Sequence, residues 1–257
     1  MNHEVVAEVL QQRVALVTGA GRNIGREIAL ALAADGIAIA VNVRSSAAEG
    51  QAVVDEIISK GGKAFLCMAD VTNHDAVTQM IAAIAKQWGR LDVVVNNAAI
   101  RNEAKIDDIT VGDWHQTLAV VLDGAFFCTQ AAVALLRKSD SAAVINIGGL
   151  TAHTGAANRV HVVTAKAGLV GMTRALAHDL SPDGITVNCI SPGMIETVRN
   201  STSSSATPNH HAKHSPLLGR RGTALEVAES VAFLAGLKAR FVTGQVLHVN
   251  GGTYLGC

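Results

Sequence analysis

The chain has 257 residues, of which 49% are hydrophobic and 16% are charged, and its formal net charge at pH 7 is zero. This length and composition suit one large domain with a well-filled core. Lys and Arg never occur in runs longer than two residues, which argues against nucleic acid and anionic membranes as partners. No uninterrupted apolar run reaches the roughly 18 residues that a membrane span needs.

Two further features of the chain favour a cytoplasmic location. The four cysteines, Cys67, Cys128, Cys189 and Cys257, are widely scattered and lack the spacing of disulfides or metal sites. The first stretch, MNHEVVAEVLQQ, has no basic start and only a short apolar run, so it does not resemble a signal peptide. We therefore expect a reduced, cytoplasmic protein without a metal site.

Short apolar runs alternate along the chain with longer amphipathic segments. Seven such runs, rich in β-branched residues, begin at Arg13, Gly36, Lys63, Leu91, Ala142, Gly184 and Gly244. Runs of this kind are typical of strands that helices cover on both faces. Helical patterns lie between them at about 24–35, 46–60, 73–88, 111–137, 160–180 and 223–236. This order predicts an α/β fold over residues 1–257, a single-domain doubly wound (Rossmann) parallel sheet of about seven strands.

One polar, Ser-rich segment at about 198–215, VRNSTSSSATPNHHAKHS, interrupts this alternation. Loops of this length in a compact domain are usually lids over a site or are partly disordered. Its three histidines, in HHAKH, raise the alternative of a metal site, but histidines in a flexible loop more often bind nothing. The segment is therefore predicted to be a mobile substrate lid.

A glycine-rich turn, TGAGRNIG at Thr18–Gly25, follows the first predicted strand and leads into a helical segment. Glycines at such a turn let the backbone approach a pyrophosphate, and the helix N-terminus offers N–H groups. The turn resembles T-G-x-x-x-G-x-G, the motif of the short-chain dehydrogenase/reductase family, with Asn23 in place of the middle glycine. Taken alone, it could also be a tight connection and nothing more.

Further stretches resemble the same family from about Arg13 to Gly252. Asp70-Val71 ends the third predicted strand, and NNAA at 96–99 resembles the N-N-A-G that ends the fourth. SPGMIET at 191–197 resembles the P-G-x-x-x-T stretch that holds the nicotinamide amide. The resemblance implies the fold described above and a nicotinamide dinucleotide cofactor.

Charges near the glycine turn bear on which dinucleotide binds. In NAD sites an acidic residue near the end of the second strand accepts a hydrogen bond from the ribose 2′-OH. Here Val43 stands at that place, Arg44 follows it, and Arg22 lies in the turn. Two guanidinium groups suit a 2′-phosphate, unless both are only solvated. We expect NADP(H) as the preferred cofactor, with NAD(H) as the alternative. The expected contacts are Gly19, Arg22, Asn23, Ile24, Gly25, Arg44, Asp70, Val71, Asn97, Ala98, Lys166, Pro192, Gly193, Ile195 and Thr197.

The resemblance also implies an Asn, a Ser, a Tyr and a Lys at the reaction centre. In this chain Val121 stands at the Asn of V-N-x-x-G, Gly149 at the Ser after the fifth strand, and Val162 at the Tyr of Y-x-x-x-K. Only Lys166 remains, and in the family it also holds the nicotinamide ribose. A general acid contributes about 10²–10⁴-fold to the rate, and an oxyanion donor about as much again. Standard Asn-Ser-Tyr-Lys chemistry is therefore not expected.

Four residues near this centre are candidates to replace the missing groups. Arg101, after NNAA, would emerge at the carboxyl end of a strand, where it could pair with an acidic substrate, stabilise an oxyanion or merely lie on the surface. Thr151 and His153 follow the position of the missing serine. His161 precedes the position of the missing tyrosine, but one helical step turns a side chain by about 100°, so it should point elsewhere. Together with Lys166 these are the candidate catalytic residues.

Three functions remain open at this point. The favoured one is an NADP(H)-dependent oxidoreductase with an atypical, rebuilt active site that acts on a small carbonyl, alcohol or activated C=C substrate. The alternative is a catalytically inactive NADP(H)-binding protein, a sensor or partner subunit, and the third is a lyase or isomerase without net redox chemistry. The resemblance also implies a homotetramer assembled through the helices at about 111–137 and 160–180. Tyr254, the one tyrosine of the chain, is expected to pack at a subunit contact.

Overall fold

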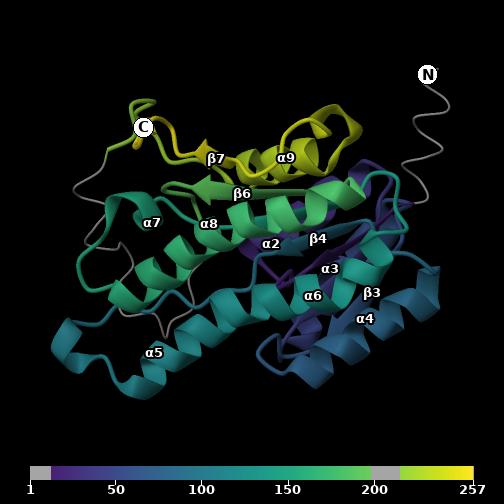
Figure 1. Ribbon diagram of the computed structural model, residues 1–257, viewed down its shortest axis with the longest axis horizontal. Coiled ribbons are helices and arrows are strands. Elements are labelled where there is room, and N and C mark those ends of the chain that lie inside the picture. Colours follow the sequence, from purple (N-terminus) through teal and green to yellow (C-terminus); the bar gives the residue numbers. More distant parts are fainter. Residues whose placement is uncertain (1–12, 198–214, 257) are drawn as a thin grey trace.

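The computed structural model describes residues 13–197 and 215–256. Within them lies one sheet of seven strands in the order β3-β2-β1-β4-β5-β6-β7 (Figure 1). Every neighbouring pair in this sheet is parallel, which confirms the predicted doubly wound fold. The strands are β1 (Val14–Val17), β2 (Ala38–Val43), β3 (Ala64–Met68), β4 (Val93–Asn96), β5 (Ala143–Ile147), β6 (Thr186–Pro192) and β7 (Val246–Val249).

Helices cover both faces of the sheet. One face carries α2 (Asn23–Ala34), α3 (Ala47–Ser59) and α9 (Ala224–Ala235), and the other carries α4 (His74–Trp88), α6 (Gly124–Leu136) and α8 (Val160–Leu180). In Figure 1 the helices α4, α6 and α8 lie in front of the sheet, and α2 and α3 lie behind it. Five of the six predicted helices begin and end within one residue of their predicted bounds.

Alternating side chains of β1 and β2 enter two separate hydrophobic cores. In β1, Val17 packs into the core under α2, α3 and α9, whereas Leu16 packs into the core under α4, α6 and α8. Val41 and Ala40 of β2 divide between the two cores in the same way. Because successive side chains of a strand point to opposite faces, a sheet buried on both sides needs strands that are apolar throughout.

A chain of buried polar side chains crosses the second core. Asn96 Nδ2 at the end of β4 donates to Thr129 Oγ1 on α6 at 3.1 Å and to Asn146 Oδ1 on β5 at 2.9 Å. Asn146 Nδ2 in turn donates to Thr173 Oγ1 on α8 at 2.9 Å. Buried polar groups are costly unless they are paired, so this network joins two strands and two helices in one arrangement.

The strand order places a ligand crevice at one position on the sheet. From β1 the chain runs outward through β2 to β3, and then returns to the other side of β1 to form β4. The helices that follow β1 and β4 therefore lie on opposite faces, which opens a crevice at the carboxyl ends of these two strands. Ligands of doubly wound sheets bind at such switch points.

The predicted helix at 111–137 is one helical stretch with a local irregularity. α5 (Val111–Leu118) passes into a π-helical segment, η2 (Ala119–Asp123), and then into α6. By length and composition alone, the helical stretch Val111–Leu136, with a mean hydropathy of 1.8, could cross a membrane. Polar residues nevertheless interrupt its apolar sequence. Its packing against α4 and α8 accounts for these apolar residues as a layer of the fold.

Several short elements were not predicted. They contain three or four residues each, which is too few for a hydrophobic period to be recognised. The predicted lid at 198–215, with its HHAKH, lies outside the described residues apart from Ser215. The short elements are η1 (Ile106–Asp108), α7 (Thr151–Thr154), η3 (Ser181–Asp183) and η5 (Leu237–Ala239).

Candidate active site

A cavity of about 400 Å³ opens at the carboxyl ends of the strands, at the switch point between β1 and β4. The segments that follow β1, β2, β3, β4, β5 and β6 all contribute to its wall. Every residue predicted to contact the cofactor, from Gly19 to Thr197, lines this cavity. Of the five candidate catalytic residues, Arg101, Thr151 and Lys166 line it as well.

The backbone of the glycine turn explains its residue types. Gly19 (φ +63°) and Asn23 (φ +51°) both adopt left-handed conformations, which asparagine tolerates better than most other residues. A Cβ atom at Gly25 would lie 2.4 Å from the carbonyl oxygen of Gly19, so only glycine fits there. α2 therefore begins directly against the turn, and its positive end faces the cavity.

Thr18 and Asn97 tie the glycine turn to the end of β4. Thr18 Oγ1 accepts hydrogen bonds from the backbone N–H groups of Asn97 at 2.9 Å and Ala98 at 3.0 Å. In the opposite direction, Asn97 Nδ2 donates to the carbonyl oxygens of Thr18 at 2.9 Å and Gly19 at 3.1 Å. The side chain of Asn97, predicted as a cofactor contact, thus also fixes the shape of the phosphate turn.

Asn42 is a structural residue of the site that the sequence did not reveal. Its buried side chain donates to the carbonyl oxygens of Cys67 at 3.2 Å and Ala69 at 3.1 Å, and it accepts from the N–H of Gly19 at 3.3 Å. One amide therefore holds the ends of β1, β2 and β3 together. A polar residue within the apolar run AIAVNV was the available signal, since a buried amide needs partners on neighbouring strands.

Arg22 and Arg44 are exposed and line the cavity at the ends of β1 and β2. Two acidic residues of the described chain also line it, Glu49 and Asp70. Asp70 Oδ1 accepts from Thr72 N at 2.9 Å and from Thr72 Oγ1 at 2.8 Å, so this oxygen is engaged in a local turn. Glu49, which the sequence did not single out, brings a carboxylate beside the glycine turn.

Lys166 projects from α8 into the opposite part of the cavity. Its side chain is only 6% exposed, and Nζ donates a hydrogen bond to the carbonyl oxygen of Ile147 at the end of β5. Burial lowers the pKa of Lys166 to about 8; the thiol of Cys189 opposes this shift, and Arg101 and Arg159 add to it. A lysine with such a pKa exchanges protons near neutral pH.

Arg159 is a second site residue that sequence reasoning missed. It precedes α8, is 8% exposed and lines the cavity. Positions 159, 162 and 166 are three and four residues apart, a spacing that places side chains on the same side of a helix. That spacing from Val162 and Lys166 was the signal that could have found it.

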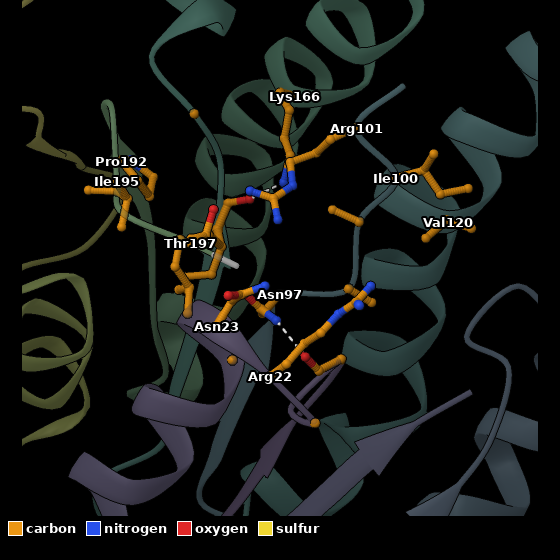
Figure 2. Close-up of a pocket in the computed structure, with 18 of the residues that line it drawn as sticks. Arg22, Asn23, Asn97, Ile100, Arg101, Val120, Lys166, Pro192, Ile195 and Thr197 are labelled. Carbon is orange, nitrogen blue, oxygen red and sulfur yellow. Dashed lines mark hydrogen bonds between the residues drawn. The ribbon is translucent and has the colours of Figure 1, made fainter. Parts of the chain in front are cut away.

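Arg101 and Lys166 come together at one end of the cavity. Arg101 lies close enough to act electrostatically on Lys166, and Figure 2 shows both residues at one end of the cavity, while Arg22, Asn23 and Asn97 lie toward the other end. The cavity therefore has one end at the glycine turn, where Arg22 and Arg44 lie with Glu49 and Asp70, and a second end around Lys166, where Arg101 and Arg159 also line the wall. Sequence order gave no indication that residues 101 and 166 meet, because they follow different strands.

A glycine and a valine occupy the two cavity positions at which the resemblance implies hydroxyl groups. Gly149 and Val162 both line the cavity. Val121 does not: it lies in η2 and packs against Ala165 and Leu169 of α8. Thr151, 8% exposed at the start of α7, is the residue that brings a hydroxyl group to this part of the wall.

The two candidate histidines lie away from the cavity wall. His153 packs against the rings of His248, with centroids 4.6 Å apart, and Tyr254, with centroids 5.4 Å apart. His161 is buried, and burial and the neighbouring Arg159 lower its pKa, while Asp113 on α5 opposes this. Neither candidate histidine lines the cavity. For His161 the helical step from position 162 predicted this, whereas for His153 the prediction of a place at the site is not supported.

The segment after β6 forms the remaining wall. Gly193 N donates to Val249 O at 2.9 Å, and Leu150 N donates to Pro192 O at 2.9 Å. A Cβ atom at Gly193 would lie 2.7 Å from Asn250 Cα, which accounts for the glycine. Pro192, Ile195 and Thr197 consequently lie together on one side of the cavity (Figure 2).

Comparison with known proteins shows that the chain is similar to dehydrogenases and reductases. A family model described as Enoyl-(Acyl carrier protein) reductase matches residues 19–254. The chain is 39% identical over 241 residues to a 3-oxoacyl-[acyl-carrier-protein] reductase FabG of Staphylococcus aureus (strain Mu50 / ATCC 700699), covering 94% of this chain and 98% of the relative. It is 37% identical over 246 residues to the (2S)-[(R)-hydroxy(phenyl)methyl]succinyl-CoA dehydrogenase subunit BbsD of Thauera aromatica, covering 96% and 98%.

Solved structures share the fold over nearly the same length. A short chain dehydrogenase from Burkholderia cenocepacia J2315, in complex with NADP, matches with a TM-score of 0.88 at 35% identity, covering 95% of this chain and 98% of that one. A dehydrogenase/reductase from Sinorhizobium meliloti 1021 matches with a TM-score of 0.89 at 33% identity, covering 96% and 99%. The similarity in fold therefore extends over nearly the whole chain.

Proposed function

Because the chain belongs to the short-chain dehydrogenase/reductase family, we propose that it is an NADP(H)-dependent oxidoreductase with an atypical active site. Its substrate is a small carbonyl, alcohol or activated C=C compound. The observation that carries this proposal is that Arg101 and Lys166 line the same cavity as positions 149 and 162 and lie within electrostatic range of one another. Charged groups there can take over the work of the hydroxyl groups that Gly149 and Val162 lack.

The cavity fits the dinucleotide at its other end. A glycine at position 25, where a Cβ would lie 2.4 Å from Gly19 O, leaves the turn close against the start of α2, as a pyrophosphate site requires. Arg22 and Arg44 line the wall where the adenosine ribose of such a cofactor would lie, and their fork-shaped guanidinium groups suit a 2′-phosphate. A relative of known structure binds NADP, which supports the same choice here.

The chemistry at the second end follows from the charges of the chain. NADPH, when bound, would supply a hydride to the carbonyl or alkene carbon. The developing negative charge on the substrate oxygen then needs positive groups and a proton. Arg101 is able to stabilise that charge, and the ammonium group of Lys166 is able to donate the proton, because its pKa of about 8 lies near neutral pH. Thr151 supplies a hydroxyl group to the same wall.

Cofactor oxidation tests this proposal directly. NADPH consumption at 340 nm is measured with ketones, oxo acids and enones, in the wild type and in Arg101→Ala, with NADPH affinity measured in parallel. We expect turnover of at least one substrate class, and a loss of about 10²-fold or more in Arg101→Ala without weaker NADPH binding. Turnover that is the same in both proteins would contradict the role of Arg101.

A second candidate function is an NADP(H)-binding protein without turnover, which acts as a sensor or as the partner subunit of a mixed oligomer. Gly149 and Val162, both in the cavity wall, favour it because neither side chain can exchange a proton. One relative is itself named as a subunit of a dehydrogenase. Tight NADPH binding with no turnover of any substrate class would favour this candidate over the first.

We also propose that the protein is a homotetramer in the cytoplasm. α6 and α8 present the exposed side chains Phe126 (42%) and Val160 (40%), and large apolar residues at the surface favour subunit contacts. Light scattering on the protein as it elutes from gel filtration tests this, with a monomer as the contradicting result.

A further inference from the structure

An acidic side chain lies at the cofactor end of the cavity, beside the glycine turn. Glu49 is in the first turn of α3, and it lines the cavity together with Arg22 and Arg44. A Cβ atom added at Gly21 would lie 3.3 Å from Glu49 Cβ and 3.6 Å from Glu49 Oε2. The carboxylate therefore lies against the backbone of the turn, in space that a larger residue at position 21 would share.

Val43, at the end of β2, meets the same point of the turn. A Cβ atom at Gly21 would lie 3.0 Å from Val43 Cγ1, and one at Gly50 would lie 3.0 Å from Val43 Cγ2, so α3 begins close to this side chain. In NAD sites an acidic residue near the end of the second strand accepts a hydrogen bond from the ribose 2′-OH. Valine cannot accept this bond, but Glu49 brings a carboxylate to the same neighbourhood from the following helix.

A capping role at the start of α3 does not account for Glu49. Ser46 and Glu49 have the S-x-x-E spacing of a capping box, in which serine and glutamate side chains bond to backbone N–H groups of the first helical turn. Here the side chain of Ser46 makes no capping hydrogen bond. Among residues 13–197 and 215–256, Glu49 has no hydrogen-bond or ion-pair partner. Its carboxylate is thus available to a ligand in the cavity.

Side chains of opposite charge therefore line the wall at which the adenosine ribose of a dinucleotide would lie. Arg22 and Arg44 attract the 2′-phosphate of NADP(H). Glu49 repels that phosphate, and it is able to accept a hydrogen bond from the 2′-OH of NAD(H). The balance between the two arginines and Glu49 then sets the preference between the dinucleotides.

We propose that Glu49 is a specificity-determining residue that accepts a hydrogen bond from the adenosine ribose 2′-OH of NAD(H), so that the site binds NAD(H) as well as NADP(H). This inference rests on the proposed oxidoreductase function for the identity of the cofactor. It adds the residue that admits the second dinucleotide.

Equilibrium binding of oxidised dinucleotides tests the role of Glu49 apart from turnover. NADP⁺, NAD⁺ and an NAD⁺ analogue that lacks the 2′-hydroxyl group of the adenosine ribose are titrated by calorimetry. The proteins are the wild type, Glu49→Gln, which removes the charge but keeps an oxygen acceptor, and Glu49→Ala, which removes both. The matched control is Glu229→Gln, which removes the same charge from an exposed position on α9 outside the cavity. Circular dichroism verifies that each variant folds.

We expect the wild type to bind both NADP⁺ and NAD⁺. Glu49→Ala should weaken NAD⁺ binding about tenfold and leave binding of the 2′-deoxy analogue unchanged, because the analogue lacks the hydroxyl group that the carboxylate binds. Glu49→Gln should weaken NAD⁺ binding less. Both variants should strengthen NADP⁺ binding about threefold or more, and this gain should shrink in about 1 M salt, which screens the repulsion between Glu49 and the phosphate. Glu229→Gln should change none of these affinities.

Other results overturn the inference. An equal loss of affinity for NAD⁺ and its 2′-deoxy analogue in Glu49→Ala excludes the hydrogen bond to the 2′-OH. Unchanged affinities for NADP⁺ and NAD⁺ in both Glu49 variants overturn the role of Glu49 and leave the proposed oxidoreductase function standing. The expected binding pattern without turnover of any substrate class supports the role of Glu49 and overturns that function, whereas binding of neither dinucleotide contradicts both.

Discussion

The side-chain amide of Asn97 donates a hydrogen bond to the carbonyl oxygen of Gly19, with 3.1 Å between Nδ2 and O. Asn97 follows β4, and Gly19 opens the turn after β1, so this bond crosses the crevice at the switch point. Thr18 reinforces the same junction through its hydroxyl oxygen. The shape of the phosphate turn therefore depends on the neighbouring strand as well as on its own glycines.

Thr18→Val should destabilise the protein through this junction. The change keeps the shape of the side chain but removes the acceptor for the N–H groups of Asn97 and Ala98. Because a buried donor without a partner costs about 1–3 kcal/mol, we expect a loss of about 2 kcal/mol or more in the free energy of unfolding. Urea denaturation measures it. Thr78→Val, at an exposed position on α4, is the control and should cost less than about 0.5 kcal/mol.

Arg22→Gln/Arg44→Gln should reverse the preference between the two dinucleotides. Without the guanidinium groups the 2′-phosphate loses its charged partners, whereas the 2′-hydroxyl of NADH never needed them. We expect NADPH affinity to fall about tenfold or more and NADH affinity to change little, as measured by fluorescence titration. An equal loss of affinity for NADPH and NADH would instead mean that the two arginines contact a part of the cofactor that both dinucleotides have.

Val162→Tyr/Gly149→Ser should create conventional ketone reductase activity. An added Cβ at Gly149 meets no atom within 4 Å, so a serine fits there, and position 162 lines the same cavity. We expect a rise of about 10²-fold or more in NADPH-dependent reduction of ketones over the wild type. Gly148→Ser is the matched control, because its Cβ would lie 2.8 Å from Cys189 Sγ and should destabilise the protein without any gain in rate. No gain in the double variant would show that residues besides these two limit the reaction.

Lys166→Met should change how stability depends on pH. Burial lowers the pKa of Lys166 from 10.5 to about 8, so between these values the unfolded chain holds a proton that the folded chain has released. The contribution of Lys166 to the free energy of unfolding is therefore lowest below pH 8. It rises by about 3 kcal/mol in total as the pH approaches 10.5. Without cofactor, we expect the wild type to gain about 2–3 kcal/mol relative to Lys166→Met between pH 7 and 10. Urea denaturation of both proteins at the two pH values measures this, and a constant difference would mean that Lys166 keeps its ordinary pKa.

Periodicity and local motifs determined much of this protein. Runs such as RVALVTG and AAVINIGG predict buried parallel strands, because only a sheet covered on both faces needs continuous apolar residues. The glycine turn was equally readable, since left-handed φ values and a contact as close as that at Gly25 leave few residue types. These properties depend on neighbours within a few positions, which is why the sequence by itself was sufficient for them.

The arrangement of the far end of the site depends on contacts between segments that are distant in sequence. Arg101 and Lys166 follow different strands, and they meet because β4 and β5 are adjacent and α8 returns across the sheet. Similarly, His161 stands beside Val162 in sequence but turns toward α5, and Asn42 gains its role from three strand ends at once. Contacts between distant segments depend on strand order and helix rotation. The charged groups that lie near the position of the missing tyrosine could therefore be identified only from the folded structure.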